Sequence, residues 1–122
     1  MIKGIGTDIV SVERIKKSMQ NEAFCERFFT EYENEYFKQK NYLPQSIAGV
    51  FCVKEAVSKA LGTGIRGFSL KDIEVRHNAL GKPEAVLFGN AKEIMEEMGG
   101  RNIHISISHT DENAVAFAVI ED

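Results

Sequence analysis

The sequence contains few of the residues that small proteins use to hold a fold together through disulfides or metal. Only two of the 122 residues are cysteines, Cys25 and Cys52, and they lie in separate helical patterns without the spacing of a metal knuckle or a disulfide framework. The three histidines, His77, His104 and His109, show no H-x-x-x-H spacing. These absences argue against a disulfide-rich secreted fold and against a zinc enzyme, and they favour a reducing compartment.

Long apolar runs and a dominant charge of one sign are also absent. No apolar stretch approaches the ~20 residues needed to span a bilayer, and the first residues lack the long apolar region of a signal peptide. Fifteen Lys and Arg against eighteen Asp and Glu give a formal net charge of −3, so a general electrostatic attraction to nucleic acid is not expected. We therefore expect a cytoplasmic protein that binds neither membranes nor nucleic acid.

Binding to an acidic protein would need a local basic patch. Arg14, Lys16, Lys17 and Arg27 lie on or just after the first predicted helix, and Arg14 and Lys17 are three residues apart on one of its faces. The same charges also fit an ordinary solvated helix face, which is the commoner role of such residues. Arg14, Lys17 and Arg27 are our candidates for contacts with an acidic partner.

The residues that are present predict one α+β domain over 1–122, an antiparallel sheet packed with helices. A chain of this length can bury a sizeable core, and it has no linker, repeat or low-complexity stretch. Helices are predicted over 11–20, around 24–29, over 30–40, from 44 to about 61 and from 90 to the glycines at 99–100. Strands are predicted over 2–10, 73–76, 84–88, 103–108 and 114–120.

Local signals add detail to three of these elements. Thr30 with Glu33, and Asn90 with Glu93, are typical of helix caps. Lys54 interrupts the apolar stripe of its helix, so either its stem packs while its ammonium group reaches solvent, or the group contacts a phosphate. The strand over 114–120 is apolar on both faces, so helices or a second subunit must cover it.

Polar residues at three places could contribute to a site. Glu55 and Lys59 lie four residues apart on one helix face, just before a glycine-rich turn, although the same pattern is an ordinary salt bridge followed by an ordinary helix stop. Asp8 interrupts the apolar run of the first strand, and its carboxylate needs a partner or serves to cap the next helix. The alternating segment 103–110 ends in hydroxyls and imidazole.

Together these segments resemble the phosphopantetheinyl transferases, specifically the short holo-[acyl-carrier-protein] synthase type. The matching segments follow the family's order and span nearly the whole chain. They are Gly4-Ile5-Gly6-Thr7-Asp8-Ile9, Phe51 to Lys59 with Gly62-Thr63-Gly64, Gly81-Lys82-Pro83, and Ser106-Ile107-Ser108-His109-Thr110. The resemblance implies transfer of 4′-phosphopantetheine from coenzyme A to a serine of an apo acyl carrier protein, with release of 3′,5′-ADP, in fatty acid biosynthesis.

The resemblance places the family's Mg²⁺ ligands at Asp8 and Glu55. Mg²⁺ prefers oxygen ligands, usually one or two carboxylates together with phosphate oxygens and water. Glu55, directly or through a metal-bound water, is our candidate for the base that takes the serine proton. Lys59 is our candidate for stabilising or protonating the departing 3′,5′-ADP. The predicted catalytic residues are therefore Asp8, Glu55 and Lys59.

Coenzyme A binding is predicted for two lysines and three short segments. These are Lys54, Lys59, Gly62-Thr63-Gly64, Gly81-Lys82-Pro83 and Ser108-His109-Thr110. The last segment resembles the family segment that meets the ribose phosphate, although His109 alone would be an ordinary turn residue. The chain departs from the family at Val50, where members often carry an Arg thought to hold coenzyme A phosphates. Phosphate binding is then expected to depend on Lys59, Lys54 or Arg66.

The resemblance also implies a homotrimer with coenzyme A in each of three clefts between subunits. Asp8 and the Glu55 helix would come from one subunit and the His109 turn from its neighbour; periodicity does not reveal the number three.

Two other hypotheses stay open. A non-catalytic coenzyme A or nucleotide-binding oligomeric module would keep the glycine turn and His109 but has little use for two metal carboxylates. A structural oligomerising domain would use Lys59 in a salt bridge with Glu55 and Asp8 as a cap.

Overall fold

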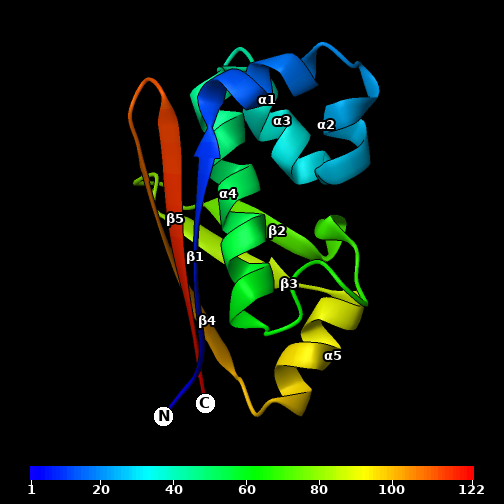
Figure 1. Cartoon of the computed structure of the whole chain (residues 1–122), viewed down its shortest axis with the longest axis vertical. Helices are drawn as coiled ribbons and strands as arrows, with labels where there is room; N and C mark the ends of the chain where they lie inside the picture. The colour runs from blue at the N-terminus through cyan, green and yellow to red at the C-terminus, as the bar shows by residue number, and fades with distance from the viewer.

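One long helix, α4 (Pro44–Ala60), occupies the middle of the fold, and most of its residues are buried (Figure 1). The computed structural model describes residues 1–122. The other elements are, in chain order, β1 (Ile2–Ser11), α1 (Val12–Met19), α2 (Ala23–Phe28), α3 (Glu31–Gln39), the short 3-10 helix η1 (Leu70–Asp72), β2 (Ile73–His77), β3 (Pro83–Leu87), α5 (Gly89–Glu97), β4 (Asn102–His109) and β5 (Asn113–Glu121). None of the helices combines the length and the apolar character that a membrane span requires.

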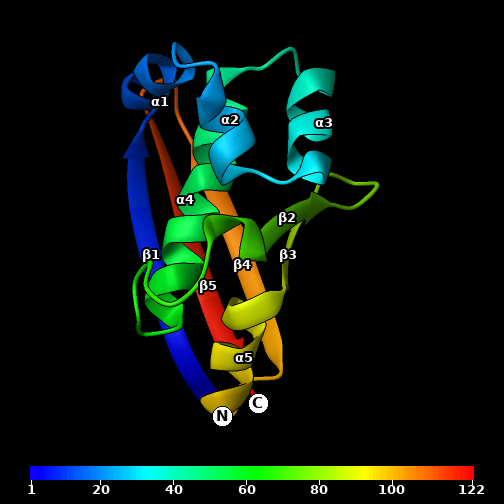
Figure 2. The same cartoon turned by 90° about the vertical axis from the view of Figure 1, so that its right-hand side faces the viewer.

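The strands form two antiparallel sheets. β5 lies in the centre of a three-stranded sheet with the order β1-β5-β4, and β2 pairs with β3 in a separate hairpin. The helices all lie on one side of the three-stranded sheet, as the two perpendicular views agree (Figures 1 and 2). This arrangement confirms the predicted α+β fold, in which an antiparallel sheet packs against helices.

Small residues on the inner face of the three-stranded sheet let α4 lie very close to it. The buried residues of β5 that face α4 include Ala114, Ala116 and Ala118. On β1 the same face carries Gly4 and Gly6, and a Cβ at either position would collide with a backbone carbonyl of α4, that of Ala60 or Ala56. Because these obstacles are backbone atoms and not flexible side chains, only glycine permits this separation of strand and helix.

The local capping signals are confirmed at one helix and wrong at another. Thr30 Oγ1 accepts a hydrogen bond from the Glu33 amide at 3.2 Å, and Glu33 Oε1 accepts one from the Thr30 amide at 2.9 Å, so the predicted capping box is present. Asn90 does not cap α5. The helix begins one residue earlier, at Gly89, whose φ of 52° is accessible to glycine, and the residue before it, Phe88, makes no side-chain cap.

Lys54 lies in the interior, so the prediction that its ammonium group reaches solvent is wrong. Its side chain is 0% exposed, and Nζ lies 2.7 Å from Glu33 Oε1. Nζ also donates to the carbonyl oxygens of Leu70, at 2.9 Å, and Ile73, at 2.6 Å. These three acceptors use the three protons of the ammonium group. The predicted phosphate contact of Lys54 is therefore not supported either.

The outer face of the three-stranded sheet is uncovered, and on β1 and β5 it is largely apolar. Ile5 is 59% exposed, Ile9 65% and Phe117 45%. The register places Ile9 opposite Val115 and Thr7 opposite Phe117, so these side chains form one surface across β1 and β5. The last strand is thus apolar on both faces, as predicted, and the helices cover only its inner face.

We expect Gly6→Ala to destabilise the protein by about 3 kcal/mol, because the added methyl group must push β1 away from α4. Urea unfolding at fixed protein concentration measures the change. Thr7→Ser, a matched control on the opposite face of the same strand, should cost less than about 1 kcal/mol. Equal stability of the two variants would show that β1 does not depend on this close approach.

Candidate functional site

The two predicted metal carboxylates lie close together where β1 passes over α4. Asp8 sits on the inner face of β1, and its main-chain carbonyl oxygen lies 3.1 Å from the Sγ atom of Cys52 on α4. One turn of α4 beyond Glu55, Lys59 Nζ lies 3.1 Å from Asp8 Oδ1 and donates to the Thr7 carbonyl oxygen at 3.1 Å. The strand and the helix therefore bring two carboxylates and one ammonium group into a single cluster.

This pairing contradicts both of the ordinary roles considered for these residues. Lys59 forms its ion pair with Asp8 and not with Glu55. Asp8 does not cap α1, because the side chain of Ser11 accepts the hydrogen bond from the Arg14 amide. Neither an isolated i,i+4 salt bridge nor a capping aspartate describes the structure.

The electrostatic environment keeps Glu55 easier to protonate than an ordinary glutamate. Partial burial raises the pKa of Glu55, and the nearby Asp8 carboxylate raises it further, while Lys59 and Arg14 oppose the shift. Burial and the Asp8 charge together raise the pKa of the Cys52 thiol to about 12. The thiol therefore stays protonated and acts as a hydrogen-bond donor behind Asp8, not as a nucleophile.

A cavity of about 230 Å³ opens beside the two carboxylates. Its lining residues come from β1, α1, α2 and α4. They are Asp8, Ile9, Val10, Arg14, Ile15, Ser18, Phe24, Phe51 and Glu55. Apolar walls thus surround the charged side chains of Asp8, Glu55 and Arg14. Such a cavity can hold an apolar group while the carboxylates act on a polar group at its edge.

The donor set at Asp8 and Glu55 fits a hard divalent cation. Both side chains offer carboxylate oxygens, and the structure contains no group of three or more His, Cys, Asp or Glu residues that could hold a metal by themselves. Mg²⁺ is commonly bound by one or two carboxylates, with phosphate oxygens and water completing its coordination. Cys52 is fully buried, and its Sγ atom lies against the carbonyl oxygens of Asp8 and Ala114, so it is not placed as a soft ligand.

A second cavity, of about 200 Å³, brings together parts of two predicted coenzyme A segments. Gly81 and Pro83 of the β2–β3 hairpin line it with His109 at the end of β4. Val50 also lines it, and none of its lining residues is Lys or Arg. This cavity shares no lining residue with the one at Asp8 and Glu55. The predicted site residues of one chain therefore gather in two separate places.

The remaining predicted ligand residues lie outside both cavities. Gly62 and Gly64 have φ values of 80° and 58° in the loop after α4, with no neighbour within 4 Å of a Cβ built on either. Lys82 is exposed in the hairpin turn. Thr110 Oγ1 accepts hydrogen bonds from two amides of its own turn. The glycine-containing loop after α4 is accessible, but these positions alone do not indicate which ligand binds there.

Two features of the site have no local signal in the sequence. Phe24, Phe51 and Ile15 form apolar walls beside the carboxylates, but in the sequence they read only as core residues. His77 stacks on Tyr36 with ring centroids 4.0 Å apart and an interplanar angle of 7°, and both rings line the second cavity. Each depends on contacts between distant segments, which periodicity does not reveal.

Comparison with known proteins shows relatives along almost the whole chain. A family model described as the 4′-phosphopantetheinyl transferase superfamily matches residues 4–118. A holo-[acyl-carrier-protein] synthase of Clostridium botulinum (strain Alaska E43 / Type E3) is 54% identical over 122 residues, covering 99% of this chain and 98% of that protein.

Solved structures show the same fold. The crystal structure of the holo-[acyl-carrier-protein] synthase from Neisseria meningitidis superposes with a TM-score of 0.92 at 40% identity, covering 100% of both chains. A holo-(acyl-carrier-protein) synthase from Bacillus anthracis, in complex with CoA (3′,5′-ADP), gives a TM-score of 0.82 at 41% identity, over 98% of this chain and 96% of that one. With the family's fold and a sequence match over almost its full length, this chain belongs to the 4′-phosphopantetheinyl transferase superfamily, among the holo-[acyl-carrier-protein] synthases.

Proposed function

We propose that this enzyme transfers the 4′-phosphopantetheine group from coenzyme A to a serine hydroxyl of an apo acyl carrier protein in fatty acid biosynthesis. The observation that carries the proposal is the cluster of Asp8, Glu55 and Lys59 between β1 and α4, next to an apolar cavity. The homologous enzyme from Bacillus anthracis, in complex with CoA (3′,5′-ADP), supports coenzyme A as the substrate.

Glu55 is suited to take the proton of the serine. In the proposed reaction the serine oxygen forms a bond to the phosphorus next to the pantetheine arm, and the bond from that phosphorus to the bridging oxygen breaks. Without a bound cation, burial and Asp8 raise the pKa of Glu55, which favours proton uptake, whereas Mg²⁺ shared with Asp8 would oppose this shift. The serine proton passes to Glu55, and 3′,5′-ADP leaves with the electron pair of the broken bond.

The other charged residues of the cluster act on the phosphates. Mg²⁺, held by Asp8 and Glu55, would supply positive charge against the pyrophosphate. Lys59 is half-exposed, and its ammonium group is already fixed near Asp8 by its contact with the Thr7 carbonyl oxygen. It can therefore stabilise or protonate the departing 3′,5′-ADP without a large rearrangement. Positioning and charge stabilisation are the main demands of phosphoryl transfer.

The direct test is to incubate the protein with coenzyme A, Mg²⁺ and an apo acyl carrier protein and to weigh the carrier by mass spectrometry. We expect a mass gain of one phosphopantetheine group. Binding of coenzyme A with no change in carrier mass would instead indicate a non-catalytic coenzyme A-binding module.

Replacing either carboxylate should abolish most turnover while preserving the fold. We expect Asp8→Ala and Glu55→Ala each to lower kcat by about 100-fold or more, since the lost charge acts mainly in the transition state. Glu97→Ala removes an exposed carboxylate from α5 and is the matched control. Circular dichroism checks that each variant is folded. Near-normal transfer by folded Glu55→Ala would exclude this residue as base or metal ligand.

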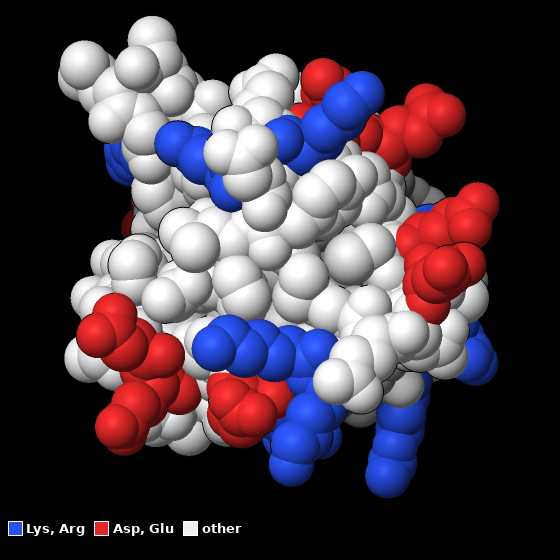
Figure 3. Space-filling view, turned by 90° about the horizontal axis from the view of Figure 1, so that it is seen from above, with Lys and Arg blue, Asp and Glu red and all other residues white.

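Basic residues near the site are proposed to orient an acidic carrier protein. Arg14 and Lys17 are exposed on α1, Arg27 is exposed on α2, and Arg14 also lines the cavity at Asp8. The face at this end of the molecule shows basic side chains among acidic ones around an uncharged centre (Figure 3). Any attraction is therefore local, and we expect it to act mainly on association rate and orientation.

Reversing the charge at Lys17 should raise the KM for the carrier about threefold to tenfold and flatten its salt dependence. Lys17 is a cleaner probe than Arg14, because Arg14 also affects the pKa of Glu55. Lys92→Glu on α5 makes the same change in net charge at the other end of the molecule and should leave the KM unchanged (Figure 1). Equal effects of Lys17→Glu and Lys92→Glu would place the docking surface elsewhere.

We further infer that the chain works as a homotrimer with shared coenzyme A sites. The uncovered apolar face of the three-stranded sheet needs a partner surface. The two cavities of one chain share no lining residue, and a ligand between subunits could meet Asp8 and Glu55 of one copy and the His109 turn of the next. Assembly would then bury the apolar face and complete the site.

Light scattering at micromolar concentration should give a mass three times that of one chain. The sharper test mixes two inactive variants, Asp8→Ala and His109→Ala, after dissociation and reassembly. If the sites are shared, some mixed trimers regain an intact site, and activity returns. If every site lies within one subunit, no activity returns, and a fully active monomer would refute the trimer as well.

A further inference from the structure

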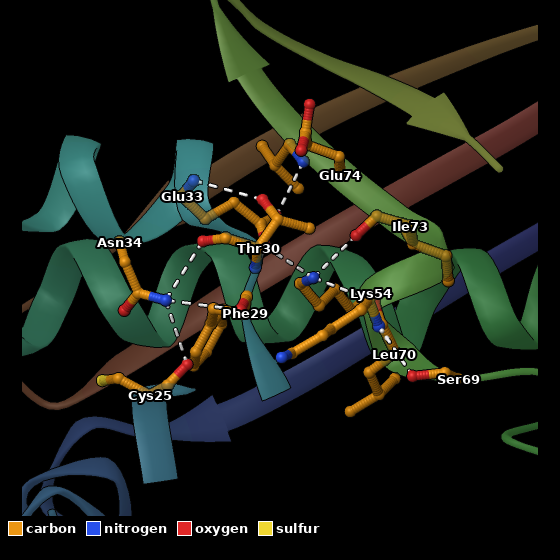
Figure 4. Close-up of polar contacts among 12 residues, drawn as sticks. Cys25, Phe29, Thr30, Glu33, Asn34, Lys54, Ser69, Leu70, Ile73 and Glu74 are labelled. Atoms are coloured by element: carbon orange, nitrogen blue, oxygen red, sulfur yellow. Dashed lines mark hydrogen bonds and ion pairs between the residues drawn. The ribbon is translucent and has the colours of Figure 1, made fainter. Parts of the chain in front are cut away.

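The buried ion pair between Lys54 and Glu33 lies outside the cavity at Asp8 and Glu55, and the proposed reaction does not use it. Figure 4 shows the Lys54 ammonium group between Glu33, from the first turn of α3, and the segment Leu70–Ile73. Burial raises the pKa of Glu33 and lowers that of Lys54, while each partner opposes the shift of the other. Lys54 therefore holds three parts of the chain at one point.

The segment from Gly62 to Ser69, which we call the glycine loop, has little structure of its own. Gly62, Gly64 and Gly67 have φ values of 80°, 58° and 80°. From Thr63 to Phe68 no main-chain group takes part in a backbone–backbone hydrogen bond, and the Thr63 hydroxyl donates locally to the Gly64 carbonyl oxygen at 2.9 Å. Phe68, near the end of the loop, packs against the core. With so few internal hydrogen bonds, the path of the residues before Phe68 depends on where the two ends of the loop are held.

Both ends of the glycine loop are fixed to the same helix. Its first residue continues directly from α4, where the Gly62 amide donates to the Lys59 carbonyl oxygen at 3.0 Å. Its other end leads into η1 and β2, where the carbonyl oxygens of Leu70 and Ile73 accept hydrogen bonds from Lys54 of α4. The side-chain hydrogen bonds of the Ser69–Asp72 capping box stay within η1 and its cap.

We propose that Lys54 is a positioning residue that closes the glycine loop onto α4. This inference rests on the proposed function and on the expectation from the sequence that Gly62, Thr63 and Gly64 bind coenzyme A. Lys54 touches no substrate; it fixes Leu70 and Ile73, and so sets where the loop lies relative to Lys59 and Asp8. Losing this anchor should weaken coenzyme A binding more than it slows the chemical step.

The test compares Lys54→Met with Glu33→Gln. Lys54→Met removes the hydrogen bonds to Leu70 and Ile73. Glu33→Gln weakens the same buried pair and replaces one of the two oxygens that accept from the Thr30 and Val75 amides, but it leaves Lys54 able to donate to both carbonyls. In Lys54→Met we expect the KM for coenzyme A to rise about tenfold and kcat to change less than about twofold. We also expect trypsin to cleave the folded protein after exposed Arg66, inside the loop, about tenfold faster.

Two further variants separate anchoring from general loss of stability. Val12→Ala lowers stability in the core at α1, away from the loop, and should change neither the KM nor cleavage at Arg66. Glu33→Gln/Lys54→Met removes both charges of the pair and carries the test if Lys54→Met alone fails to fold; its loop should behave as in Lys54→Met. Equal effects of Val12→Ala and the Lys54 variants would overturn the proposal.

Unchanged KM and unchanged cleavage in the Lys54 variants would also overturn it. The proteolysis is done without coenzyme A, so it tests the anchor independently of the reaction. Faster cleavage in a protein whose wild type transfers nothing would support the anchor and refute the proposed function. Normal transfer by the wild type, with unchanged cleavage in the Lys54 variants, would support the proposed function and refute the anchor.

Discussion

The arrangement of the site depends on how closely β1 approaches α4. Gly4 and Gly6 have no side chains to hold the strand away from the helix, and the carbonyl oxygens of Ala56 and Ala60 occupy the space where a Cβ would lie. At this separation Asp8 reaches both Cys52 and Lys59 of α4, each with a contact of 3.1 Å. A shift of one ångström would break both contacts, because hydrogen bonds weaken steeply beyond about 3.5 Å.

The same helix, α4, carries two charged side chains in different surroundings. Lys54 lies in the interior, and Glu55 lies at the candidate site. Lys54 is fully buried, and Glu33 and two carbonyls use all its protons, so it is chemically silent. A pair of this kind adds little net stability over an apolar core, but removing one partner leaves the other buried and unpaired. Glu55 is only partly buried and keeps a raised pKa beside Asp8. Neighbouring positions on one helix thus hold one side chain locked in the interior and one that faces the cavity at Asp8.

How much the sequence could predict depends on how far apart the interacting residues lie along the chain. Thr30 and Glu33 cap a helix within four residues, so their pattern was sufficient. The fold class could be predicted because the motifs occur in the family's order along the chain, and the structure brings the predicted residues Asp8 and Glu55 to one cavity. The burial of the Lys54 ammonium group could not be predicted, because its acceptors lie on α3 and beyond the glycine loop. The cap at Asn90 failed because Gly89, with its positive φ, begins the helix one residue earlier.

The alternation of β4 limits what the segment 108–110 can do for a single ligand. His109 pairs with buried Ala114 and points to the inner side, where it lines the cavity with Gly81 and Pro83. Ser108 pairs with Val115 on the uncovered outer face, in line with Ile9 across the sheet. Successive strand residues face opposite sides, so one ligand cannot meet both side chains from the same side. In the proposed trimer, a subunit that covers the outer face would therefore lie against Ser108, while His109 would line the cavity with Gly81 and Pro83.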